Sequence, residues 1–178
     1  MLEEIAKYDK DFSEGTFLTK VDHIFIMILD AIMDNDMSSV KHFLSEDIYL
    51  KYEELTKEYS SKGYTRIFDE MNVKSTQISD YKVDENNINV EVILTSRYMD
   101  YFLDSNGEYV SGENTRRIEK NHFITFTKKL NAEKYNEIRR CPGCGASVDV
   151  NESGKCKYCG TIFNASDYDY VITKMAII

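Results

Sequence analysis

Four cysteines carry the clearest chemical signal in the sequence. They form two Cys-x-x-Cys pairs, Cys141–Cys144 and Cys156–Cys159, and a glycine follows each pair. Two thiolates three positions apart in a tight turn can face one ion, and two such turns supply the four ligands of a tetrahedral site. The glycines let the backbone fold back so that its N–H groups point at sulfur. This spacing predicts one structural Zn²⁺ ion bound by Cys141, Cys144, Cys156 and Cys159.

Other uses of these cysteines fit the sequence less well. The N-terminal residues 1–4 are acidic and do not resemble an export signal, so we expect a cytoplasmic chain whose thiols stay reduced. A redox-active pair would need a single motif at the start of a helix, and neither pair precedes a helical pattern. Iron can occupy a Cys₄ site in vitro. Because a ribbon of about 25 residues cannot bury a useful core, metal binding, worth roughly 10–16 kcal/mol in small zinc peptides, would supply its folding energy.

Positive charge gathers just before the cysteines. Residues 115–140 hold eight Lys and Arg against three Asp and Glu, although the whole chain has a net charge of −9. Such a run can be a solvated strand edge that discourages edge pairing, or a contact for an acidic protein, a phospholipid surface or nucleic acid. The acidic chain as a whole disfavours nucleic acid. We take five residues as candidate binding residues: Arg116, Arg117, Lys120, Lys128 and Lys129.

An enzyme is the competing class of function. A carboxylate whose pKa is raised by apolar walls could act as a general acid or base in a pocket. The candidates for such chemistry are Asp100, His122, Tyr98, Tyr101 and Tyr109. The sequence contains no phosphate-binding glycine loop, no nucleophile motif and no metal site with an open position. We therefore expect no catalytic activity, and we expect His23 and His42 to be structural.

Hydrophobic spacing predicts helices over residues 1–62. Apolar residues recur every three to four positions from Phe17 to Ile32, which predicts one long helix that is covered on more than one side. Ser13 and Thr16 offer caps for it. Ser38 or Ser39 is expected to start a second, short helix, and Ser45 a third that Gly63 ends.

After residue 64 the pattern changes to strands. Apolar and polar residues alternate over 88–94 and 122–127, and residues 104–107, Asp-Ser-Asn-Gly, form a strong reversal. Residues 167–178 read as a last strand. This strand either packs against the metal ribbon or pairs antiparallel with residues 121–130. We favour the pairing, because the ribbon is too small to offer a long partner strand. Helices followed by antiparallel strands predict an α+β fold.

Several short segments also resemble a known family. These are Asp11-Phe12-Ser13 before the long helix, residues 35–40 and 43–45, Phe123-Ile-Thr-Phe126, and Asp169-Tyr-Val-Ile172. In this order, over residues 11–130 and 166–178, they resemble the C-terminal domain family of the mitochondrial inner-membrane translocase subunit forty-four, in a bacterial form with a zinc ribbon. The resemblance implies a cone of the nuclear-transport-factor-two or cystatin kind, in which helices pack on a curved antiparallel sheet with a pocket. The mitochondrial proteins also carry a long N-terminal region for motor binding, which this sequence does not show, so an import-motor function is not implied.

Together these patterns predict a cone-like α+β domain formed by residues 1–135 and 165–178, with helices in 1–62 and strands in 64–130 and 168–177. A zinc ribbon is expected as an insertion at 139–163. We expect a non-catalytic, zinc-containing binding or adaptor protein that is cytoplasmic or peripheral to a membrane. It would engage a protein partner or an anionic membrane, and a homodimer stays open. The alternatives are small-molecule binding or acid/base catalysis in the pocket, and nucleic-acid binding through the ribbon.

Overall fold

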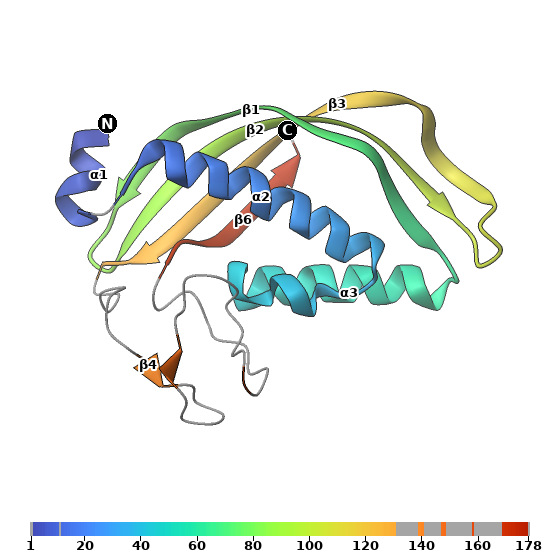
Figure 1. Cartoon of the computed structure of the whole chain (residues 1–178), viewed down its shortest axis with the longest axis horizontal. Helices are drawn as coiled ribbons and strands as arrows, with labels where there is room; N and C mark the ends of the chain where they lie inside the picture. The colour runs from blue at the N-terminus through green and yellow to red at the C-terminus, as the bar shows by residue number, and fades with distance from the viewer. Residues whose placement is uncertain are drawn as a thin grey trace.

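The computed structural model describes residues 2–10, 12–130, 139–140, 147–148, 158 and 169–177. A four-stranded antiparallel sheet in the order β1-β2-β3-β6 arches over the helices, which lie against its concave face (Figure 1). The helical elements are α1 (Leu2–Tyr8), α2 (Glu14–Met33), the 3₁₀-helix η1 (Met37–Phe43) and α3 (Glu46–Ser61). The strands are β1 (Thr65–Val83), β2 (Asn87–Leu103), β3 (Tyr109–Lys129), β4 (Arg139–Arg140), β5 (Ser147–Val148) and β6 (Val171–Ile177). The predicted α+β class is confirmed.

Helix α2 is the central helix of the core. The apolar stripe predicted from the sequence is buried, and it comprises Phe17, Val21, Ile24, Phe25, Ile28, Leu29, Ala31 and Ile32. Ser13 occupies the N-cap position, but its side chain makes no hydrogen bond to the helix backbone. The helix therefore depends on burial of its broad apolar surface more than on capping.

The two shorter helical elements begin and end at local signals. The carboxylate of Asp36 accepts a hydrogen bond of 2.9 Å from the Ser38 N–H, so η1 starts one residue before the expected Ser38 or Ser39. Ser45 caps α3 by accepting from the Ile48 N–H at 3.4 Å, as predicted. Gly63, with φ of 70°, ends α3 in a Schellman motif, in which its N–H and that of Tyr64 donate to two carbonyls of the last turn.

The sheet is built from three long strands interrupted by bulges. Register shifts occur in the β1–β2 pair after Asp69, Val73 and Ile78, and in the β2–β3 pair after Tyr98 and Phe102. Each extra residue bends its strand and increases the local twist. Five such irregularities explain how strands of 19, 17 and 21 residues curve around the helices instead of forming a flat sheet.

The last strand completes the sheet. β6 pairs antiparallel with β3, from His122 opposite Ile177 to Thr127 opposite Val171. This pairing confirms the prediction that the C-terminal strand lies beside residues 121–130. The division into a cone domain and an inserted ribbon at 139–163 stays a prediction, because most of that range, with all four cysteines, lies outside the described residues.

Alternation along the strands separates an inward face from an outward face. On β2, Ile88, Val90, Val92 and Leu94 are fully buried against the helices. On β3 the directly opposed residues Lys128, Phe126, Ile124 and His122 share that face, because opposed residues of an antiparallel pair point the same way. The concave face is therefore the apolar core of the fold, with a few polar side chains embedded in it.

Candidate functional site

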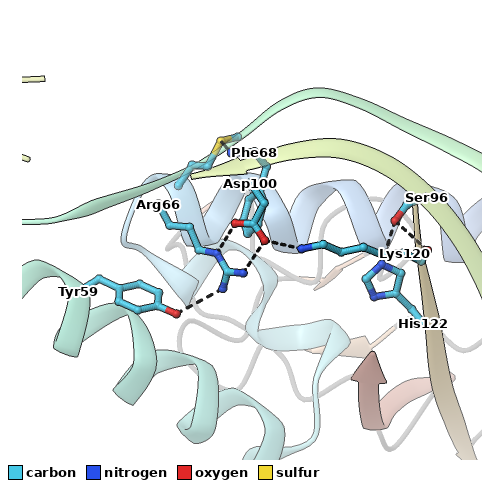
Figure 2. Close-up of polar contacts among 8 residues, drawn as sticks. Tyr59, Arg66, Phe68, Ser96, Asp100, Lys120 and His122 are labelled. Carbon is cyan, nitrogen blue, oxygen red and sulfur yellow. Dashed lines mark hydrogen bonds and ion pairs between the residues drawn. The ribbon is translucent and has the colours of Figure 1, made fainter. Parts of the chain in front are cut away.

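Polar side chains meet on the concave face near the start of β1. The guanidinium of Arg66 on β1 donates from Nε and Nη2 to the two carboxylate oxygens of Asp100 on β2, both at 2.8 Å (Figure 2). Lys120 on β3 donates to Oδ2 of the same carboxylate at 2.5 Å. Tyr59 of α3 accepts a longer hydrogen bond of 3.3 Å from Arg66. We call Arg66, Asp100 and Lys120 the concave ion cluster.

Three neighbouring strands assemble this cluster by register. Phe68 lies opposite Asp100 in the β1–β2 pair, so Arg66 is one same-face step away along β1. Ser96 lies opposite Lys120 in the β2–β3 pair, which puts Lys120 on the same inward face as Asp100. A shift of one residue in either pairing would turn these side chains to the outer face.

The cluster is only slightly accessible to solvent. The side chains of Arg66, Asp100 and Lys120 are 21%, 10% and 18% exposed. Burial raises the pKa of the Asp100 carboxyl, but hydrogen bonds from Arg66 and Lys120 outweigh burial and hold this pKa below its usual range. Burial also disfavours the charged form of Arg66, yet Asp100 raises the pKa of the guanidinium. Both Asp100 and Arg66 are therefore ionised at neutral pH.

Aromatic rings surround the two cations. The Arg66 guanidinium lies 4.8 Å from the centre of the Phe68 ring and 5.6 Å from that of Phe102. Nζ of Lys120 lies 4.9 Å from the centre of the Tyr98 ring. Each contact is an attraction between a cation and the negative face of a ring. The rings thus hold both cations in place at the edge of the apolar core.

A buried histidine lies deeper along β3. Nε2 of His122 is 2.8 Å from the Ser96 hydroxyl, while Nδ1 is buried without a hydrogen-bond partner in the described part of the chain. Its ring packs against Phe25, with 4.7 Å between the ring centres. Burial and then the charge of Lys120 lower the pKa of His122 to about 4. The ring is therefore neutral at pH 7.

Of the residues proposed for acid/base catalysis, Asp100, Tyr98 and His122 share the inward face, where the ring centres of Tyr98 and His122 are 6.4 Å apart, whereas Tyr101 and Tyr109 do not. Asp100 has a lowered pKa, the opposite of the raised value that a general acid needs. Burial, followed by the charge of Asp100, raises the pKa of Tyr98 far above neutrality. Tyr109 is 51% exposed and donates to the Gly112 carbonyl at 2.7 Å, and Tyr101 lies on the other face of β2 from Asp100. This geometry favours ion pairing and recognition over proton transfer.

The five predicted binding residues do not form one exposed face. Lys120 belongs to the concave ion cluster, and Lys128 is paired with Asp9 at 2.7 Å with only 19% of its side chain exposed. Arg116 and Arg117 are exposed at 80% and 42%, near Glu113 and Glu70 at 3.5 and 3.4 Å, and Lys129 is also exposed. The sequence contained a signal for the difference, because Lys120 and Lys128 share the two-residue period of His122, Ile124 and Phe126.

The sequence gives no local pattern that marks Arg66 as a functional residue. Its partner Asp100 is 34 positions away, and only the strand register brings the two together. The predicted zinc ligands are not tested, since they lie outside the described residues. Within the described ranges no group of three or more His, Cys, Asp or Glu is placed to hold a metal ion. Nor does any helix described there have the length and hydrophobicity to span a bilayer.

Comparisons with known proteins add family information. No curated protein matches the chain. A solved structure, the intermembrane space region of the chloroplast protein ARC6, is similar with 11% sequence identity and a TM-score of 0.48, over 94% of this chain and 97% of that chain. The Tim44-like domain matches residues 1–137, well over half of the 178 residues. The chain therefore belongs to the Tim44-like domain family.

Proposed function

We propose that this protein is a non-catalytic adaptor that binds a protein partner and associates peripherally with an anionic membrane. Membership of the Tim44-like family supports a protein-interacting role at a membrane surface. One structural observation carries the choice of binding over catalysis. The inward-facing carboxylate of Asp100 is held ionised between Arg66 and Lys120, so it is arranged for recognition of charge and not for donating a proton at neutral pH.

The membrane contact is assigned to the exposed part of the basic segment. The side chains of Arg116 and Arg117 are 80% and 42% exposed, whereas Lys120 and Lys128 face inward in ion pairs. Each cation near an anionic surface contributes about 1 kcal/mol. Of the two locations expected from the sequence, cytoplasmic and peripheral to a membrane, we therefore favour the peripheral one.

Flotation with anionic and neutral vesicles tests this assignment. The double variant Arg116→Glu/Arg117→Glu should lower binding to anionic vesicles and leave the background with neutral vesicles unchanged. Lys57→Glu/Lys62→Glu is the matched control, because it makes the same charge change at two exposed residues, one in α3 and one directly after it. Equal losses in both double variants would show a response to net charge alone. Absence of flotation by the unmodified protein would contradict the membrane part of the proposal.

The partner is tested by affinity capture followed by a binary binding measurement. Proteins captured from native cells by the full chain are identified by mass spectrometry, purified and titrated against it by calorimetry. We expect one of them to bind directly with a defined stoichiometry. If none binds the purified chain, the adaptor function is wrong.

We further propose that Cys141, Cys144, Cys156 and Cys159 bind one structural Zn²⁺. The support is their spacing, since four thiolates match the ligand set of closed structural sites. The ion would hold the ribbon in place and would not take part in a reaction. We also propose that the chain is a bacterial member of the family, as its resemblance to zinc-ribbon forms implies. A homodimer is a further proposal, and the oligomeric state of the purified protein tests it.

A further inference from the structure

The concave ion cluster carries one more positive charge than negative charge. Arg66 and Lys120 share the single carboxylate of Asp100. Among the described residues no second carboxylate forms an ion pair with either cation. Charges that are mostly removed from solvent are costly unless they are paired. The cluster therefore retains an unmatched positive charge in a site of low polarity.

The two cations also retain hydrogen-bond donors. A guanidinium has five N–H groups, of which Asp100 accepts two and Tyr59 one. An ammonium has three, of which Asp100 accepts one. Within the part of the chain that the structure describes, two N–H groups on each cation donate no hydrogen bond. The aromatic contacts of Phe68 and Tyr98 hold the cations without using these donors.

The position of the cluster selects the kind of anion that can reach it. The three side chains are between 10% and 21% exposed and lie on the concave face, with Tyr59 of α3 beside Arg66 (Figure 2). A flat lipid surface contacts protruding residues such as Arg116, which is 80% exposed. Contact with these recessed cations instead requires a narrow group, such as a single carboxylate at the end of a chain or side chain. The neighbouring rings of Phe68, Phe102 and Tyr98 suit an apolar residue beside that carboxylate.

We propose that Arg66 and Lys120 bind a carboxylate of a partner peptide, which completes the charge balance of the concave ion cluster alongside Asp100. This inference rests on the proposed adaptor function and deepens it by giving the chemistry of the recognised group. The carboxylate can be a C-terminus or an acidic side chain. The two share one chemistry, and the experiment below separates them.

The test is a titration of the purified full chain with acetate, followed by the NMR signals of Arg66 Nε and Lys120 Nζ. We expect a saturable shift of both signals. Lys120→Gln removes the surplus charge and should weaken acetate binding about tenfold or more, the effect of losing a charged hydrogen bond. Lys120→Arg should retain binding. Asp100→Asn, which raises the local charge, should strengthen it, and acetate should raise the Tm of this variant.

Lys128→Gln is the matched control, since Lys128 is also a partly buried lysine of β3 that is paired with one carboxylate. It should leave acetate binding unchanged. Three peptides then separate the sources: acetylated Ala-Leu-Phe with a free C-terminus, its C-terminal amide, and that amide with Glu in place of Leu. Binding of the first alone identifies a chain terminus, and binding of the third identifies an acidic side chain.

Several results would overturn the inference. They are the absence of a saturable shift, equal acetate binding by the Lys120→Gln variant, or weaker binding by a folded Asp100→Asn variant. A shift with inorganic phosphate but not with acetate would replace the carboxylate by a phosphate group and would also overturn it. The titration needs no partner protein. Its failure is therefore distinct from failure of the capture experiment that tests the adaptor function.

Discussion

Acidification from pH 7 to pH 5 should destabilise the fold through two buried histidines. His42 on η1 and His122 on β3 are 7% and 2% exposed. Burial, and then the charge of a nearby lysine, lowers the pKa of each ring from 6.5 to about 4. Both rings are thus neutral in the folded chain at pH 5. In the unfolded chain they bind a proton below about pH 6.5.

Proton linkage gives the sign and the size of this change in the free energy of unfolding. The unfolded state binds more protons between pH 6.5 and 4, so the free energy of unfolding falls as the pH falls through this window. With pKa values of 6.5 unfolded and about 4 folded, each ring lowers the free energy of unfolding by about 2 kcal/mol between pH 7 and pH 5. The two rings together give about 4 kcal/mol, which is large beside the roughly 5–15 kcal/mol that stabilises a typical domain.

Urea denaturation at pH 7, 6 and 5 measures this effect. His42→Gln and His122→Gln should each reduce the loss of stability between pH 7 and pH 5 by about 2 kcal/mol, and the double variant by about twice that amount. His23→Gln replaces an exposed histidine of α2 and controls for the substitution itself. Comparison of each variant with the unmodified chain cancels the contribution of other groups that titrate in this range.

Parallel curves of the free energy of unfolding against pH, for the double variant and the unmodified chain, would contradict this prediction. If the double variant loses as much stability between pH 7 and pH 5 as the unmodified chain does, the two rings are not buried as neutral bases. A smaller effect for His122 alone would indicate that its imidazole accepts a proton in the folded chain, beside Ser96.

Three further outcomes are expected. Asp100→Ala should lower the free energy of unfolding by about 2–3 kcal/mol, because it leaves two partly buried cations unpaired, and an unchanged urea midpoint would contradict the burial of the pair. Gly112→Ala should cost about 2–4 kcal/mol, since φ is 105° and an added Cβ would lie 2.4 Å from the Asp100 carbonyl oxygen. The control Gly15→Ala, with nothing within 4 Å, should be neutral or stabilising by up to about 1 kcal/mol in the same urea assay. Elemental analysis of protein purified without chelator should find one zinc per chain, with loss of the ion in Cys141→Ser, and well under half an equivalent would refute the metal site.

Local patterns were sufficient to predict the elements and their class. The helical repeat from Phe17 to Ile32 and the alternation from Ile88 to Leu94 both reflect burial of one side of an element, and the structure confirms each. The pairing of β6 with β3 was also predictable, because an apolar strand needs a partner and residues 121–130 offered one. The resemblance to the family is confirmed by the Tim44-like match over residues 1–137, whereas the bacterial form with a zinc ribbon stays a prediction.

Long-range geometry was not predictable from one sequence. The bulge after Asp69 contains Glu70 at a φ of 50°, which no turn residue in the sequence marks. Such bulges shift the register by one residue and decide which side chains face inward. The contact of Arg66 with Asp100 depends on that register. The charge run therefore suggested a basic surface, whereas Lys120 faces inward in an ion pair.

The pairing of β3 with β6 has a consequence for how this architecture can vary. The chain leaves the inner strand β3 after Leu130 and re-enters the sheet at Val171 as the edge strand β6, so hydrogen bonds between the two strands fix both attachment points. The entropy of closing such a connection grows slowly, by about 0.6 kcal/mol for each doubling of length. We therefore expect the β3–β6 pairing to tolerate connections of different lengths between Leu130 and Val171, which makes this position a rational choice for grafting a foreign module.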